Sequence, residues 1–145
     1  MYFESFHPGL SIVTPQRTIT AGELDAFIGI TGLDLPMFLN DDDAQALGHA
    51  RRLVTGPMVL AVAMGLVRAC GCFDQVVAVV EFTDMRFRKA VHPGDTLCAH
   101  IQTIETRPTR DTGRGLVVLG YTIRNQDDVV VLEMKGTYLF RRRLL

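Results

Sequence analysis

The sequence predicts an α+β protein in which one apolar helix is enclosed by an antiparallel β-sheet. Residues 57–70 form an apolar segment with Arg68 as its one charged residue, and several longer segments after it alternate apolar and polar residues. The first pattern indicates a buried helix, and the second indicates half-buried strands. Because 145 residues can bury a substantial core, we expect a single domain over residues 1–145.

Capping residues mark both ends of the central helix. Thr55 is suited to the N-cap, and Pro57 is tolerated in the first turn because its missing N–H would have no helical partner. Gly71 can adopt the left-handed conformation that ends a helix. A membrane-spanning helix needs about 20 apolar residues, which is more than this segment offers. We therefore expect a helix buried on every side, with Gly65 allowing a strand or second helix to approach closely.

Shorter helices are predicted before the central one. Thr20 begins a capping-box pattern, and the apolar spacing after it predicts a helix that ends near Gly32. Residues 33–39 are too apolar for an ordinary surface loop. Asn40 or Asp41 then caps another short helix, with acidic residues in its first turn.

After Gly71 the apolar residues change from helical spacing to alternation, which predicts strands at 76–91, 96–106, 115–124 and 129–140. Turn residues separate these strands, so they form an antiparallel meander. A curved antiparallel sheet around one apolar helix is the hotdog fold. Since such a sheet has open edges, we expect at least a dimer.

Composition limits the classes of function. A net charge of −1 gives no support for nucleic acid or a membrane surface as a partner, and we interpret the basic run 141–143 as a solvated tail. Residues 1–4 lack the basic start of a signal peptide. Three cysteines fit a reducing cytoplasm, so a cytoplasmic location is expected. Cys70 and Cys72 lack the second pair that a zinc site needs; we expect no metal and interpret them as small core residues.

Several segments resemble the MaoC-like family of (R)-specific enoyl-CoA hydratases and dehydratases. The similar segments are residues 2–6, 17–20, 31–38, 52–56 and 85–96, the last of which is similar to the family's R-F-x-x-P-V-x-x-G-D pattern. This resemblance implies a hotdog fold and hydro-lyase activity on acyl-CoA, as in fatty acid metabolism. It also implies no cofactor other than the coenzyme A carried by the substrate.

The residues that are catalytic in the family motif are replaced by others in this chain. The family loop reads T-G-D-x-N-P-x-H, and here Leu33, Leu35 and Phe38 stand at its Asp, Asn and His positions, while Pro36 remains. Thr55 replaces the histidine that usually precedes the following glycine. Leucine and phenylalanine cannot accept a proton, so the resemblance implies atypical or weak catalysis.

Hydration of an enoyl thioester needs a general base, a proton donor and N–H groups directed at the thioester oxygen. Backbone amides can meet the last need without a special side chain. The start of the central helix at Gly56, or the loop 71–74, could present them. Thioester binding can therefore persist where proton transfer is lost.

Two side chains are candidates for the missing acid–base pair. Asp34 lies one residue beyond the family's Asp and is either a base in the pocket or a surface carboxylate. His49 precedes the central helix and either replaces the lost His or is a solvated loop residue. His7, His92 and His100 have no evident partner in the sequence.

A basic cluster and an apolar loop complete the candidate site. Arg86, Arg88 and Lys89 can meet the phosphates of coenzyme A, or can serve solubility alone. Thr55 is assigned with them to the coenzyme A site. The apolar loop either lines the acyl chain or is core; its candidate lining residues are Leu33, Leu35, Pro36 and Phe38.

Three classes of function remain open. The first is a hydratase or dehydratase that uses a rearranged pair, Asp34 with His49. The second is an inactive subunit that binds acyl-CoA, either as a homo-oligomer (a dimer or hexamer) or paired with an active hotdog subunit. The third is a thioesterase, which is disfavoured because residues 57–70 hold no acid, although Asp34 or Glu81 could activate water.

Overall fold

The computed structural model describes residues 1–143. A short 3₁₀ turn, η1, spans Phe3–Ser5, and the helices are α1 (Ala21–Thr31), α2 (Pro36–Leu39), α3 (Asp41–Ala46) and α4 (Gly56–Ala69). The strands are β1 (Ser11–Val13), β2 (Arg17–Thr18), β3 (Val76–Phe87), β4 (Thr96–Pro108), β5 (Arg114–Arg124) and β6 (Val130–Arg141). The predicted order of elements, short helices, one long helix and then four long strands, is confirmed.

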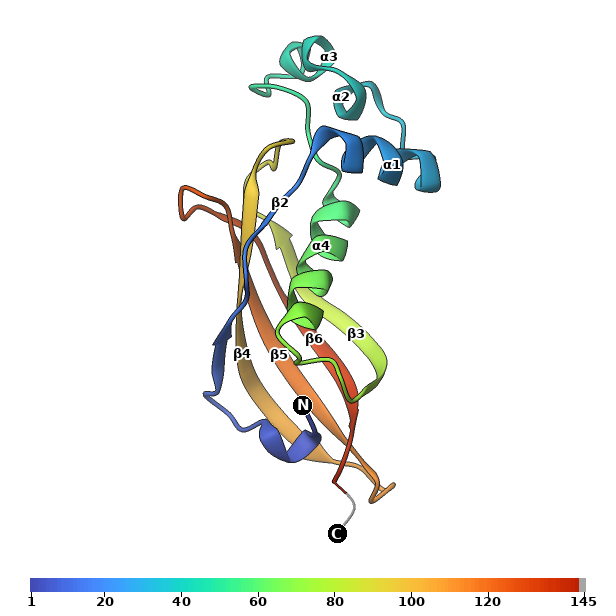
Figure 1. Cartoon of the computed structure of the whole chain (residues 1–145), viewed down its shortest axis with the longest axis vertical. Helices are drawn as coiled ribbons and strands as arrows, with labels where there is room; N and C mark the ends of the chain where they lie inside the picture. The colour runs from blue at the N-terminus through green and yellow to red at the C-terminus, as the bar shows by residue number, and fades with distance from the viewer. Residues whose placement is uncertain (144–145) are drawn as a thin grey trace.

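The strands form one antiparallel sheet in the order β1-β4-β5-β6-β3, with the short β2 also paired to β4. Figure 1 shows the sheet curving behind α4, while α1, α2 and α3 gather beyond the N-terminal end of that helix. This is the predicted hotdog architecture of the α+β class. Strand β3 is an edge strand, and register shifts interrupt its ladder with β6.

One face of α4 packs against the sheet, and the opposite face is open. The buried residues of the helix are Met58, Val59, Val62, Ala63, Leu66 and Val67. They join the inward-facing residues of β5 and β6 in one core. Burial of this kind stabilises a protein by about 25 cal/mol per Å² of apolar area. The expectation of burial on every side is wrong for the single chain, because Ala61, Gly65 and Ala69 are exposed.

The expected close approach at Gly65 is likewise absent from the described residues, since a Cβ built there meets no atom within 4 Å. Such an approach does occur in the sheet. A Cβ on Gly136 would lie 2.7 Å from the ring of Tyr138, which is fully buried. Tyr138 accepts a hydrogen bond of 2.8 Å from Tyr121 and donates one of 3.5 Å to the sulfur of Met64, and burial raises the pKa of both phenols.

Capping chemistry was predicted correctly at both long helices. Thr20 accepts a hydrogen bond from the Glu23 N–H at the start of α1, and Gly32 ends that helix with a left-handed φ of 70°. Thr55 accepts from the Met58 N–H at the start of α4. The apolar stretch after α1 contains an unpredicted turn of helix, α2, which begins at a proline suited to a first helical turn.

Two strand-end predictions need correction. The strand expected over 76–91 ends at Phe87, because the following residues leave the sheet and the Val91 carbonyl accepts a hydrogen bond from the Val54 N–H before α4. The basic run 141–143 is not a solvated tail. Arg141 ends β6, Arg142 forms an ion pair of 2.9 Å with Glu4, and Arg143 lies over the ring of Tyr2. Within residues 1–143, no helix is long and apolar enough to cross a membrane.

Candidate functional site

A cleft of about 380 Å³ opens at the N-terminal end of α4. We call it the Gly56 slot. It is lined by Phe38, His49, Leu53, Val54, Gly56, Val59, Phe87, Arg88, Lys89, Ala90 and Val91. The lining comes from α4, from the end of β3 and from the loops that lead into α4, so three distant parts of the sequence form one site.

The backbone at Gly56 supplies an unused hydrogen-bond donor. Thr55 is fully buried, and its hydroxyl caps the Met58 N–H at 3.2 Å. Pro57 has no N–H, and among the described residues nothing accepts a hydrogen bond from the Gly56 N–H. The positive end of the helix dipole lies at the same place. The slot therefore presents a donor to an oxygen that carries negative charge.

The neighbouring aromatic ring leaves little space beside Gly56. A Cβ built on Gly56 would lie 3.0 Å from Cζ of Phe87, which is closer than ordinary van der Waals contact. Phe38, which precedes Gly56 by 18 residues, lines the same slot. The donor thus lies in a slot whose lining includes two aromatic side chains.

Arg52 ties the Phe38 loop to the approach of α4. Its side chain donates to the Phe38 carbonyl at 2.6 Å and forms an ion pair with Asp25 of α1. Its backbone N–H donates to Asp41 at 2.8 Å. The Leu53 N–H adds a bond of 3.1 Å to the Met37 carbonyl. These contacts hold the Phe38 loop against the segment that leads into α4.

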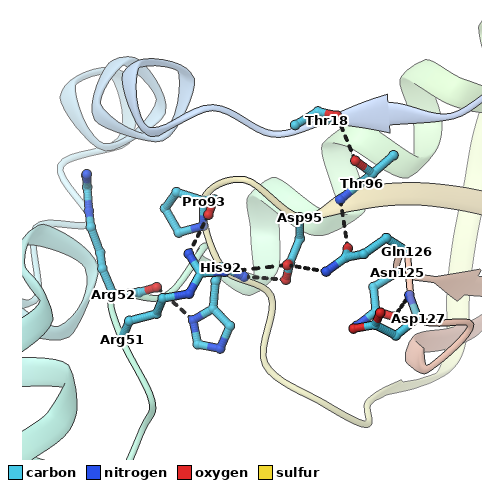
Figure 2. Close-up of polar contacts among 10 residues, drawn as sticks. All are labelled: Thr18, Arg51, Arg52, His92, Pro93, Asp95, Thr96, Asn125, Gln126 and Asp127. Atoms are coloured by element: carbon cyan, nitrogen blue, oxygen red, sulfur yellow. Dashed lines mark hydrogen bonds and ion pairs between the residues drawn. The ribbon is translucent and has the colours of Figure 1, made fainter.

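A buried carboxylate holds the other side of the slot. Asp95 is 4% exposed and accepts hydrogen bonds of 2.9 Å from the His92 N–H and from the Gln126 side chain. Arg51 lies 3.7 Å from the same carboxylate and also donates to the Pro93 carbonyl. Figure 2 shows these residues converging from the segment before α4, the turn before β4 and the β5–β6 hairpin. We call this group the Asp95 clamp.

His92 completes the clamp through its ring. The Nδ1 atom lies 2.9 Å from the Arg52 carbonyl, so it carries the proton and donates to that oxygen. The adjacent Val54 N–H donates to the Val91 carbonyl at 2.7 Å. The segment before Gly56 is therefore bonded to the turn before β4 at Arg51, Arg52 and Val54, and His92 has a structural contact that its sequence did not indicate.

The two predicted acid–base residues are not brought together. His49 lines the Gly56 slot, whereas Asp34 is exposed and does not line it. None of the described residues that line the slot carries a carboxylate. The proposed roles of Asp34 and His49 stay predictions, with His49 placed where it can reach a bound ligand.

The predicted basic cluster divides between two faces. Arg88 and Lys89 line the slot, while Arg86 faces a separate hollow of about 410 Å³ on the side of the sheet away from α4. Arg88 also borders that hollow and pairs with Glu133 at 2.8 Å. Among the described residues Lys89 has no ion-pair partner, so it is the cation free to meet a ligand's phosphate. A role of Thr55 toward coenzyme A stays a prediction, since its hydroxyl caps the helix.

The predicted apolar lining is only partly gathered. Phe38 lies in the slot, and Leu33 is half-buried against the core. Leu35 and Pro36 instead line a shallow hollow with α3. The loop therefore contributes one side chain to the slot and directs the others elsewhere.

Sequence reasoning missed Arg52, Phe87 and Asp95 as residues that build the site. Phe87 was assigned to a strand, and its contact with Gly56 joins residues 31 positions apart. Asp95 ends the segment that is similar to the family's G-D pattern, but the sequence indicated only a turn there and not a buried carboxylate. An acidic residue after Pro-Gly is an ordinary turn residue, so no local signal distinguishes it from a buried one.

The arrangement can bind and polarise a carbonyl. An apolar cleft with one backbone donor and a cation at its rim suits an acyl group attached to a phosphate-bearing carrier. Among residues 1–143, no group of three or more His, Cys, Asp or Glu side chains is placed to hold a metal ion. Fold and slot together define a hotdog-fold protein with a ligand cleft at the start of its central helix.

Comparison with known proteins gives the family. The family model described as "MaoC like domain" matches residues 5–123, so the chain belongs to the MaoC-like family. It is 31% identical over 144 residues to the β-methylmalyl-CoA dehydratase of Chloroflexus aurantiacus, covering 98% of this chain and 40% of that protein. The chain thus spans less than half the length of this curated relative.

Solved structures agree with the fold. An Archaeoglobus monoamine oxidase regulatory protein superposes with a TM-score of 0.90 at 26% identity, covering 99% of this chain and 96% of that one. A Chloroflexus aurantiacus MaoC domain protein dehydratase superposes with a TM-score of 0.91 at 28% identity, covering 99% of this chain and 41% of that one. The hotdog assignment and the family resemblance are confirmed.

Removing the clamp carboxylate tests how the slot is held. Asp95→Ala removes a buried acceptor that the His92 N–H and the Gln126 side chain share, so we expect the free energy of unfolding to fall by about 1–3 kcal/mol. Asp127→Ala, in the exposed tip of the same hairpin, is the matched control and should stay within about 0.5 kcal/mol of wild type. Urea unfolding at equal protein concentrations measures both. Equal stability of the two variants would contradict the clamp.

Proposed function

We propose that the chain binds an acyl thioester of coenzyme A in the Gly56 slot, with the thioester oxygen accepting a hydrogen bond from the Gly56 N–H. The observation that carries this proposal is the unused donor at the start of a 14-residue helix, in a slot that Phe38 and Phe87 line. Enolate charge develops on that oxygen during hydration or dehydration, and a preorganised N–H stabilises it. Lys89 at the rim meets a phosphate of the carrier.

The chemistry we propose is that of a hydratase or dehydratase, at a low rate. The MaoC-like family and the dehydratase name of the Chloroflexus relative support this reaction class. His49 is the proton-transfer group that lines the slot. Leu33 and Phe38 stand where the family motif carries its Asp and His, so the water is activated poorly. A missing general acid or base typically costs 10²–10⁴-fold in rate.

A second candidate is a catalytically inactive subunit that binds acyl-CoA. The specific observation in its favour is Phe38, whose side chain lies inside the slot at the motif's His position. Such a subunit would retain binding and lose proton transfer. The two candidates therefore share the ligand and differ in turnover, which makes them separable in one assay.

We also propose that two copies pair through β3. This 12-residue edge strand exposes five large apolar residues: Val77, Val79, Val80, Phe82 and Phe87. A long apolar edge is a ready template for a second strand, and a β3–β3 pairing would cover it. The opposite edge, β1, has only three residues.

Blocking the slot tests ligand binding. Gly56→Val adds a branched side chain against the ring of Phe87. We therefore expect the dissociation constant for butyryl-CoA, measured by titration calorimetry, to rise at least tenfold. A saturated acyl chain prevents turnover during the measurement. Gly29→Ala, at an exposed glycine of α1 with nothing within 4 Å of its Cβ, is the control and should bind like wild type. Absence of wild-type binding at millimolar ligand would contradict the proposal.

Restoring the motif tests the account of weak catalysis. The substitution Phe38→His places an imidazole inside the slot, and we expect hydration of crotonyl-CoA to rise by about 10²-fold. Loss of enoyl absorbance and release of free thiol are followed in parallel, because thiol reports thioesterase activity instead. Leu39→His places the imidazole on an exposed neighbour and should change nothing.

Single variants test which side chain is responsible for the slow hydration by the wild type. His49→Ala should lower it, while Asp34→Ala should leave it unchanged if the exposed carboxylate stays outside the slot. A wild type that turns over as fast as ordinary hydratases would contradict weak catalysis. Binding of the ligand with neither loss of enoyl absorbance nor release of thiol would favour the inactive subunit over the slow hydratase.

A charge on β3 tests the pairing. Val80 lies near the middle of β3, so an antiparallel pairing brings it close to its own copy and Val80→Glu sets like charges opposite each other. We expect the dimer dissociation constant from sedimentation equilibrium to rise at least tenfold. Val13→Glu on β1 is the control, since Val13 and Val80 are equally exposed at 55% and 56%. A dimer that dissociates in the Val13→Glu variant and not in the Val80→Glu variant would contradict pairing through β3.

A further inference from the structure

Two thiols lie side by side at the C-terminal end of α4. The Sγ atoms of Cys70 and Cys72 are 3.3 Å apart, and both cysteines are free. The third cysteine, Cys98, lies on β4, where its thiol donates to the Thr14 carbonyl at 3.3 Å. The chain therefore contains one close pair of thiols and one separate thiol that can serve as an internal reference.

The backbone turn between Cys70 and Cys72 brings the two sulfurs together. Cys70 is the C-cap of α4, and the residue between the thiols, Gly71, has a φ of 78°, in the left-handed region that favours glycine. The turn is fixed from outside as well. The N-terminal ammonium of Met1 donates to the Gly71 carbonyl at 2.9 Å, and Arg68 forms an ion pair with Asp74 across the turn.

The two thiols differ in access. Cys70 is partly exposed, whereas Cys72 is fully buried. Burial, followed by the hydrogen bond with Cys70, raises the pKa of Cys72 to about 12. Cys72 is therefore a protected thiol that meets other reagents only through Cys70. An exposed attacking thiol beside a buried resolving thiol is the arrangement that thiol–disulfide exchange requires.

We propose that Cys70 and Cys72 are a redox-active dithiol that low-molecular-weight disulfides, such as glutathione disulfide, oxidise to an intrachain disulfide. Cys70 attacks one sulfur of the small disulfide, forming a mixed disulfide and releasing one small thiol that takes up the Cys70 proton. Cys72 then attacks the Cys70 sulfur and releases the second small thiol, which takes up the Cys72 proton. The chain loses two protons and two electrons, and the small disulfide gains them.

This dithiol is separate from the Gly56 slot. The two sites lie at opposite ends of α4, whose 14 residues span about 21 Å at 1.5 Å per residue. Neither sulfur lines the slot. The proposal therefore stands or falls independently of thioester binding.

Oxidation of the folded protein with glutathione disulfide, followed by alkylation and intact mass measurement, tests the proposal. We expect the number of alkylated thiols to fall from three to one, with no glutathione attached. Peptide mapping should place the remaining alkyl group on Cys98 and the disulfide between Cys70 and Cys72. Dithiothreitol should restore three alkylated thiols. Three alkylated thiols after oxidation, a persistent glutathione adduct in wild type, or a disulfide between chains would overturn it.

Two variants separate the roles of the thiols. Cys72→Ser removes the resolving thiol, so a glutathione adduct should now accumulate on Cys70. Because Cys72 is buried, the result for this variant is interpreted only if its circular dichroism spectrum matches that of the wild type. Cys70→Ser, at the partly exposed position, is the second variant and should show no adduct and no disulfide. Cys98→Ser should form the disulfide as wild type does. A Cys70→Ser protein that still loses its Cys72 thiol would contradict the assigned order.

Discussion

The apolar face of α4 is buried against the curved sheet, and this burial decides where the N-terminus of the helix lies. Six buried residues of α4 share one core with the inward side chains of β4, β5 and β6. Because the helix cannot slide without exposing them, its first N–H group is held at a fixed place beside the end of β3. The slot follows from that constraint: Phe87 ends β3 next to Gly56, and the loop bearing Phe38 covers the same opening.

Polar contacts hold the segments that surround the start of α4. Arg52 bonds the Phe38 loop to the helix approach, and the Asp95 clamp bonds that approach to the turn before β4. The slot that results offers a backbone donor at Gly56, and none of the described residues that line it carries a carboxylate. Because this donor belongs to the backbone, it does not depend on which side chains stand at positions 33 and 38.

Much of the fold could be predicted because its signals are local. Helix caps at Thr20 and Thr55 and the change from helical to alternating spacing depend on neighbours within a few residues. The site depends on contacts between distant segments, such as Arg52 with Phe38 and Asp95 with Gln126, and no local pattern reports them. Burial of α4 on all sides was wrong because composition records how apolar a helix is and not how many faces the chain itself covers.

The central claim is that the Gly56 N–H receives the thioester oxygen. The most direct measurement is the ¹⁵N–¹H resonance of Gly56 in protein titrated with butyryl-CoA, with Gly29 of α1 as the reference amide. The account predicts a saturable shift of the Gly56 proton toward stronger hydrogen bonding, with Gly29 unmoved. Saturable binding that leaves the Gly56 resonance unchanged would contradict it, because the ligand would then occupy another part of the molecule.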